Sequence, residues 1–166
     1  MINNESSRYI LNVLNQMKNQ IADIETKLME QEMPITPIFS NKKAIIGNYD
    51  SFGSKELKKI LESFGMIVEI FETGSEILEK ISEGYCCDII FTNSTYKRGI
   101  QCEELLNKLR QLPHFNIPII IHTIYKNERI HFVDNIGFDE FIAKPIYSND
   151  NEKILEIKNI LERFLK

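Results

Sequence analysis

Hydrophobic residues follow two different rules along this chain of 166 residues. Between Ile10 and Leu28 they recur at steps of four and three residues, whereas from Lys43 onward short apolar runs alternate with stretches of helical spacing. Steps of four and three place side chains on one stripe of a helix, and a short, uninterrupted apolar run is typical of a buried strand. The pattern therefore predicts an N-terminal helix, followed by a domain in which strands and helices alternate.

The N-terminal stripe has the period of a coiled coil, and it holds for about three heptads. The a positions are Leu14, Ile21 and Leu28, and the d positions are Ile10, Met17 and Ile24. Such a seam needs a partner helix to bury it, so residues 1–33 are expected to form a helix that makes the protein a homodimer. Val13 widens the apolar stripe, which suits the alternative of an amphipathic helix folded back onto its own domain. Pro34 and Pro37 then mark residues 34–41 as a linker.

The second segment reads as five strand–helix units, the fourth of which lacks a clear helical pattern. We expect strands at residues 43–47, 66–71, 88–92, 117–123 and 140–144, and helices at 54–63, 74–84, 101–112 and 151–165. Residues 126–135 carry no clear pattern. Repeated strand–helix units predict an open, doubly wound α/β fold with a parallel sheet and helices on both faces. In such sheets the functional crevice lies beyond the carboxyl ends of the strands, so the residues that directly follow each strand are the candidates for a site.

Those strand ends resemble the response-regulator receiver domain. The stretch "KKAIIGNYDSFGSKELKKILESFG" aligns without gaps to the usual opening of a receiver, and "GFDEFIAKPI" is similar to its fifth-strand signature. The resemblance covers residues 42–166 and implies the receiver or flavodoxin-like fold, with five parallel strands in the order 2-1-3-4-5. It also implies that Lys144 and Pro145 match the family's lysine and proline, Thr123 its switch threonine or serine, and Phe141 its switch aromatic residue.

The acidic residues of that family are replaced at the matching positions. Asn48 and Tyr49 stand where receivers carry an acidic pair that holds Mg²⁺, and Asn93 stands at the phosphoacceptor aspartate. An aspartate attacks phosphorus through an anionic oxygen, and Mg²⁺ prefers hard anionic oxygen ligands. A neutral amide or a phenol ring supplies neither function. We therefore expect a degenerate receiver, a pseudo-receiver, that has no catalytic residue, binds no metal and carries no cofactor.

Asp50 lies one residue beyond the lost acidic pair. A lone carboxylate is a poor site for Mg²⁺, which gives up its water reluctantly, so Asp50 is better placed to pair with Lys144. Lys144 could instead donate a hydrogen bond to the side-chain oxygen of Asn93. The alternative that keeps phosphorylation is an atypical phosphoacceptor at Asp50 or Ser94. Thr123 is expected to cap its strand, and His122 beside it to be a partly buried, hydrogen-bonded histidine.

Composition and charge narrow the class of protein further. A net charge of −4 disfavours a nucleic-acid partner, which normally requires a basic face. The three cysteines show neither CxxC spacing nor a cysteine–histidine cluster, so no zinc signature is present. The N-terminus does not resemble a signal peptide, and no apolar run approaches the roughly 20 residues of a membrane span. The protein is therefore expected to be cytoplasmic and not to bind membranes.

These observations favour a role in two-component signalling in which this protein is not itself phosphorylated. The leading hypothesis is a non-catalytic, phosphorylation-independent adaptor that contacts a kinase or another regulator, with dimerisation through the N-terminal helix. No recognisable effector follows the last helix, so output is expected through protein contacts, on the surface formed by residues 127–135, 140–143 and 151–165. The alternative is a flavin-like small ligand at the strand ends, for which "NYDSFGS" offers a polar loop without a glycine-rich phosphate cradle.

Overall fold

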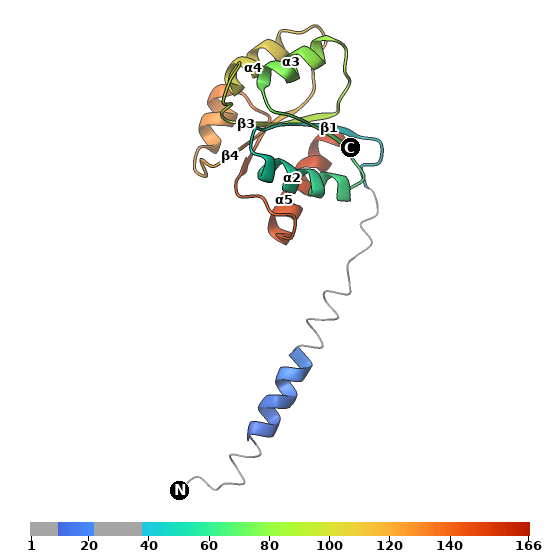
Figure 1. The fold of residues 1–166 in the computed structure, drawn as a ribbon, viewed down its shortest axis with the longest axis vertical. Helices are drawn as coiled ribbons and strands as arrows, with labels where there is room; N and C mark the ends of the chain where they lie inside the picture. Colours follow the sequence, from blue (N-terminus) through green and yellow to red (C-terminus); the bar gives the residue numbers. More distant parts are fainter. Residues whose placement is uncertain (1–9, 22–37) are drawn as a thin grey trace. The chain divides into compact units, whose positions relative to one another are not determined.

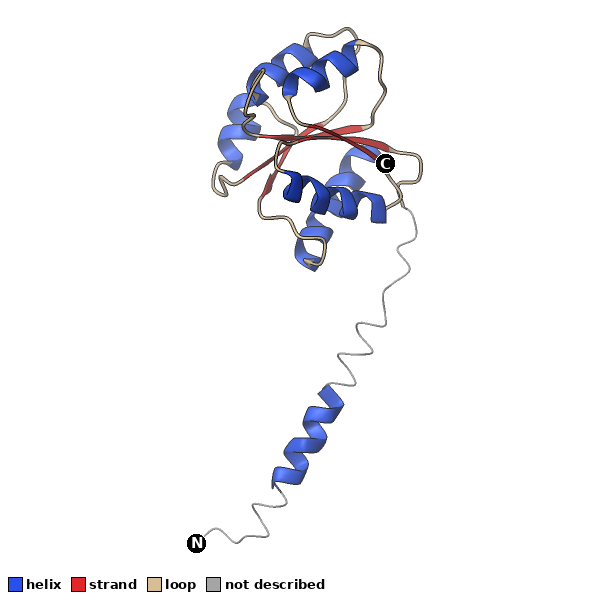
Figure 2. Ribbon diagram, viewed as in Figure 1, coloured by secondary structure: helices blue, strands red, loops and turns tan. Residues whose placement is uncertain are grey.

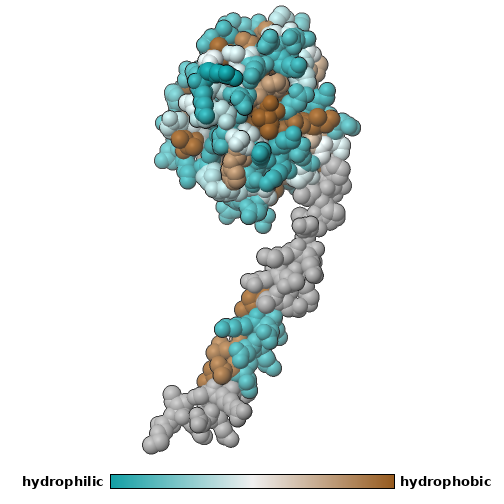
Figure 3. Space-filling model, viewed as in Figure 1, coloured by the Kyte–Doolittle hydropathy of each residue, from teal (hydrophilic) through white to brown (hydrophobic). Residues whose placement is uncertain are grey.

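The computed structural model of the chain describes residues 10–21 and 38–166, which belong to two units spanning residues 1–35 and 36–166. Residues 10–21 form a helix, and Figure 3 shows its hydrophobic atoms gathered on one side. Its apolar side chains Ile10, Leu11, Leu14, Met17 and Ile21 are all at least half exposed. The heptad positions Ile24 and Leu28 lie outside the described residues, so the coiled coil and the homodimer stay predictions.

The second unit is built on a parallel sheet of five strands in the order β2-β1-β3-β4-β5, as predicted. The strands are β1 (Lys43–Gly47), β2 (Ile67–Phe71), β3 (Ile89–Asn93), β4 (Ile119–Thr123) and β5 (Glu140–Ala143). All residues of β3 and β4 are buried, as expected for central parallel strands covered on both faces. Because all strands run in the same direction, their carboxyl ends meet at one edge of the sheet.

Helices cover both faces of the sheet (Figures 1 and 2). The helices are α2 (Ser51–Ser63), α3 (Gly74–Ser82), α4 (Cys102–Arg110), the short π-helix η1 (His131–Ile136) and α5 (Asn151–Leu165). Helices α2 and α5 bury one apolar core with Ile46, Phe91 and Ile120 of the sheet, and α3, α4 and η1 bury a second core with Ile45, Ile90 and Ile121. The two cores follow from the alternation of successive strand side chains between opposite faces.

Helix α2 begins at Ser51, three residues before the predicted start at Ser54. The Asp50 carboxylate caps this end, accepting hydrogen bonds from the backbone N–H groups of Phe52 at 3.1 Å and Gly53 at 3.2 Å. Such a cap satisfies donors that a helix leaves unpaired in its first turn. The apolar pattern alone missed the first turn because Ser51, Phe52 and Gly53 are not buried.

The unpatterned segment before β5 contains η1, and Arg129 just before η1 is tied to the sheet through one buried carboxylate. Glu140 accepts hydrogen bonds from Arg129 at 2.9 and 3.1 Å, from Arg163 of α5, and from the backbone N–H of Phe141 at 3.0 Å. Burial alone would raise the pKa of Glu140, but these donors outweigh burial and hold that pKa below its usual value. As an ionised group, Glu140 of β5 therefore links Arg129, just before η1, to Arg163 of α5.

Candidate functional site

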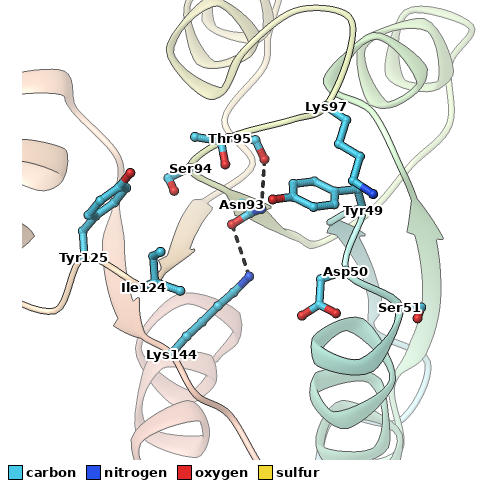
Figure 4. A pocket seen from close by; sticks show the side chains of 10 residues that line it. All are labelled: Tyr49, Asp50, Ser51, Asn93, Ser94, Thr95, Lys97, Ile124, Tyr125 and Lys144. Carbon is cyan, nitrogen blue, oxygen red and sulfur yellow. Dashed lines mark hydrogen bonds between the residues drawn. The ribbon is translucent and has the colours of Figure 1, made fainter.

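A pocket of about 490 Å³ opens beyond the carboxyl ends of the strands (Figure 4). Five residues singled out from the sequence line it, namely Tyr49, Asp50, Asn93, Ser94 and Lys144. The other lining residues are Ser51, Thr95, Lys97, Ile124 and Tyr125. Together the lining residues come from the ends of β3 and β5, from the first residue of α2 and from the loops after β1, β3 and β4. This is the edge at which ligands bind in open parallel sheets.

Asn48 shapes the loop after β1 and does not line the pocket. It is 1% exposed, and its Oδ1 accepts a hydrogen bond from the backbone N–H of Asp50 at 3.1 Å. Its Nδ2 donates to the Asp50 carbonyl at 3.3 Å. The Asn48 amide is thus occupied in a turn that sets Asp50 as the cap of α2.

Asn93 ends β3 and makes two side-chain hydrogen bonds of opposite direction (Figure 4). Its Nδ2 donates to the Thr95 carbonyl at 2.9 Å, and its Oδ1 accepts from Lys144 Nζ at 3.2 Å. A carboxylate here could accept from Lys144, but its second oxygen would face the Thr95 carbonyl with no proton between them. The amide therefore satisfies both neighbours where a carboxylate would satisfy one.

Lys144 is half-buried and is followed by a cis peptide bond to Pro145. Burial lowers the pKa of Lys144, and the charge of Asp50 opposes that shift. Among the residues that the structure describes, Lys144 has no salt bridge, so the pairing with Asp50 that the sequence suggested is absent and the contact with Asn93 is present. Pro145 is exposed and does not line the pocket.

Thr123 is the last residue of β4 and caps the end of this strand with its hydroxyl. It is fully buried, its hydroxyl shares a hydrogen bond of 2.8 Å with the hydroxyl of Ser94, and its Oγ1 accepts from the backbone N–H of Tyr125 at 3.3 Å. Phe141 is 7% exposed, and its ring stacks on that of Phe132 with centroids 6.2 Å apart. Phe141 thus lies in the core and not in the pocket wall.

His122 differs from the expectation of a partly buried, hydrogen-bonded histidine. It is 1% exposed, and neither ring nitrogen has a hydrogen-bond partner within the described part of the chain. Burial, with a smaller effect from the charge of Lys144, holds the pKa of His122 well below its ordinary value. The alternation along β4 indicated which face His122 occupies, but it gives no information on whether a polar group lies opposite.

Two residues of the loop after β3 were not singled out from the sequence. Tyr96 is 6% exposed, and its hydroxyl shares a hydrogen bond of 2.7 Å with Thr92 Oγ1. It packs so closely on the end of β1 that a Cβ at Gly47 would clash with the Tyr96 oxygen. The second residue is Lys97, whose Nζ lies 4.9 Å from the ring centroid of Tyr49. An aromatic residue in a polar loop is the signal that could have found Tyr96.

Three solved structures show which known fold this is. The receiver domain of a signal transduction histidine kinase from Syntrophus aciditrophicus is 25% identical, with a TM-score of 0.62 over 75% of this chain and 89% of that one. A chemotaxis response regulator from Vibrio cholerae is 19% identical, with a TM-score of 0.63 over 76% of this chain and 100% of that one. The receiver domain of a sensor histidine kinase from Pseudomonas aeruginosa, which holds a magnesium ion in its active site cleft, is 17% identical, with a TM-score of 0.64 over 75% and 98%.

The described part of residues 36–166 therefore has the fold of response-regulator receiver domains, as the strand-end residues predicted. No protein-family model and no curated protein matches the sequence. Within residues 10–21 and 38–166, no helix is both long enough and apolar enough to span a membrane.

The residues at the strand ends do not fit a magnesium ion. Both carboxylate oxygens of Asp50 already accept N–H groups of α2, and the Asn48 oxygen accepts the N–H of Asp50. No cluster of three or more acidic, histidine or cysteine side chains suited to a metal occurs in the described ranges. Mg²⁺ needs several free oxygen ligands in octahedral geometry, which these side chains do not offer.

Proposed function

We propose that this chain is a non-catalytic, phosphorylation-independent signalling adaptor, which keeps the receiver fold and acts through protein contacts. The observation that carries the proposal is the Asn93 amide, hydrogen-bonded to Lys144 and to the Thr95 carbonyl at the end of β3. At this position a receiver requires an anionic nucleophile, and a neutral amide oxygen does not serve as one. The fold itself is that of two-component signalling regulators.

The hydrogen bonds around the pocket favour one fixed state over a switch. Thr123 is held by Ser94 and by the backbone of Tyr125, and Phe141 is buried against Phe132. A signal can shift a two-state protein only if it binds the two states differently. Without a phosphoryl group to supply that difference, the protein presents one surface to its partner at all times.

The partner-binding surface in this proposal is formed by η1, β5 and α5. The partner is a kinase or another regulator of the same signalling class. Ile130 before η1 is 67% exposed and Leu155 of α5 is 55% exposed, so apolar anchors are available there. The exposed stripe of residues 10–21 makes the protein a homodimer by pairing with a second copy of the same helix.

The decisive experiment is an intact-mass measurement after incubation with acetyl phosphate and Mg²⁺. The wild-type protein is expected to gain no phosphoryl adduct, which weighs about 80 Da. Asn93→Asp restores a carboxylate but not a metal site, and it is also expected to gain none, since the metal must neutralise the transferring group. An adduct on the wild-type protein, at Asp50, Ser94 or elsewhere, would refute phosphorylation independence.

A further inference from the structure

Strand β2 forms one edge of the sheet, and its outer side has no strand beside it in the described part of the chain. In a parallel pair, every second residue of a strand bonds to the same neighbour. The N–H of Ile67 donates to the Lys42 carbonyl at 2.8 Å, and the Phe71 carbonyl accepts from the loop after β1 at 2.9 Å. The odd-numbered residues of β2 thus bond toward β1, and the backbone groups of Val68 and Ile70 point outward.

The outward backbone groups of this edge are unequally satisfied. Lys58 Nζ of α2 donates to the Val68 carbonyl at 3.3 Å, and the N–H of Glu72, directly after β2, donates to Glu76 Oε2 at 3.0 Å. No strand of the described residues faces the N–H of Val68 or the N–H and carbonyl of Ile70. Unpaired backbone groups on an edge strand are a template for another strand. The open part of the edge spans residues 68–70.

Apolar side chains flank the open edge on both faces of the sheet. Ile67 is 51% exposed and Ile70 is 37% exposed. Val68 packs in the core under α2, and Phe71 packs against the core under α3. Because successive side chains alternate between faces, Ile70 lies on the α2 face and Ile67 on the α3 face. An added strand would therefore cover exposed apolar surface on both faces.

The same edge is acidic. Residues 62–79 contain five glutamates and no lysine or arginine. Glu69 lies on the α3 face, where its Oε1 accepts a hydrogen bond from the Tyr85 hydroxyl at 2.7 Å, and Glu72 is exposed. Neither of these glutamates forms a salt bridge within residues 10–21 and 38–166. On the α2 face, Lys58 is paired with Glu62 at 3.5 Å, so its charge is balanced.

This charge pattern determines which kind of strand fits the edge. A second copy of β2 would bring Glu69 and Glu72 close to their own counterparts, and like charges on paired strands are destabilising. The glutamates would repel a nucleic acid, whose backbone is anionic. A strand that alternates apolar and basic residues fits both faces, since its apolar side chains would lie beside Ile70 and its cationic side chains beside Glu69.

We propose that the open edge of β2 binds an extended, basic segment of a partner protein, which adds to the five-stranded sheet as a further strand. Backbone hydrogen bonds to Val68 and Ile70 hold the segment, its Lys or Arg side chains pair with Glu69 and Glu72, and Lys58 turns away from the Val68 carbonyl to admit it. Strand addition of this kind takes its affinity from the main chain and its specificity from alternate side chains.

This site lies apart from the surface of the proposed function. Strands β2 and β5 are the two opposite edges of the sheet. A segment bound at β2 therefore leaves the surface of η1, β5 and α5 free, and neither proposal depends on the other.

The test is a titration of the ¹⁵N-labelled full chain with three synthetic hexapeptides, followed by the amide chemical shifts. A peptide that alternates lysine and valine is expected to bind and to shift the signals of residues 67–72. The second peptide has glutamate in place of lysine, and the third has proline in place of the middle valine, which removes one backbone donor. Both should bind at least about tenfold more weakly, because one lacks the charge complementarity and the other the backbone hydrogen bond.

Variants of the protein test the same edge. Ile70→Pro removes the outward N–H at an edge position where proline is tolerated, and it should weaken the lysine–valine peptide at least about tenfold. Ile70→Thr keeps the N–H and the branched side chain, so this matched control should bind nearly as the wild type does. Lys58→Met should tighten binding, because it frees the Val68 carbonyl. Glu69→Gln combined with Glu72→Gln should weaken binding and is the second variant, in case Ile70→Pro does not fold.

Three outcomes would overturn the proposal. The first is no binding of the lysine–valine peptide, or equal binding of either of the other two peptides, or unchanged binding in both the Ile70→Pro and the double glutamine variants. The second is a set of shifts confined to η1 and α5, which would place the peptide on the surface of the proposed function. The third is a lower mass of Ile70→Pro than of the wild type in light scattering, which would assign the edge to a second copy of this chain.

Discussion

His122 is expected to make the stability of this domain depend on pH between 8 and 5. Its ring is fully buried without a hydrogen-bond partner in the described residues, and the charge of Lys144 further disfavours protonation. The pKa of His122 is therefore lowered in the folded state, while in the unfolded chain it is about 6.5. A group of this kind contributes stability above its unfolded pKa, and this contribution is lost as the pH falls toward its folded pKa.

The size of this pH dependence follows from the proton that His122 binds in the unfolded chain but not in the folded protein. Each pH unit below about 6.5 costs about 1.4 kcal/mol, so about 2 kcal/mol is lost between pH 8 and pH 5 if the folded protein stays unprotonated there. His122→Leu removes this loss. At pH 8 the same variant should differ from the wild type by less than about 1.5 kcal/mol, because the volumes are similar and two unsatisfied nitrogens disappear.

The assay is urea unfolding followed by far-ultraviolet circular dichroism at several pH values, since the chain contains no tryptophan. The stability of His122→Leu relative to the wild type should rise by about 2 kcal/mol from pH 8 to pH 5. His131→Gln, at an exposed position of η1, is the control and should follow the wild type. Parallel loss of stability in the wild type and His122→Leu would show that the folded protein protonates His122, which would refute the reasoning.

Three further predictions concern other contacts. The pKa of Glu56 is lowered to about 2, first by its hydrogen bond from Lys59 and then by those from Ser148, so the stability that the Glu56 carboxylate contributes should fade as the pH falls from about 4.5 to 2. Glu56→Gln should lower the urea midpoint at pH 7 and flatten the dependence of that midpoint on pH. Unchanged unfolding curves would contradict this prediction. Tyr96→Phe removes the bond to Thr92 and should cost about 1 kcal/mol of unfolding free energy, measured by urea unfolding. Leu14→Asp combined with Ile21→Asp should halve the mass measured by light scattering, and an unchanged mass would exclude a dimer through this seam.

The sequence predicted the elements well where burial decides them, and less well where hydrogen bonds do. Strand β1 and helix α5 have the predicted bounds, since their apolar residues follow one period from end to end. Helix α2 starts earlier because the Asp50 cap, and not a buried face, sets its first turn. The segment before β5 had no readable period because it is fixed by buried Phe132 and by the ion pair of Arg129 with Glu140, residues that come together only after folding.

The candidate site shows the same division. The rule that strand ends form the crevice located five residues that line the pocket, namely Tyr49, Asp50, Asn93, Ser94 and Lys144. It also pointed to Asn48 and Thr123, which are buried beside the pocket and do not line it. It did not predict Lys97, because the path of the loop after β3 has no periodicity from which a position could be inferred. Nor did it predict which partner Lys144 selects, since that depends on distances of a few ångströms between three loops.

The two arginines on Glu140 have a consequence for the kinetics of association. Arg129, just before η1, and Arg163 of α5 both donate hydrogen bonds to Glu140 of β5, so this one carboxylate cross-links the three segments. If a partner docks here, as the adaptor proposal has it, little backbone would be left to order, and less interaction energy would be spent on conformational entropy. The proposal then predicts an association rate in the ordinary range of about 10⁵–10⁷ M⁻¹s⁻¹, with differences in affinity arising mainly in the dissociation rate.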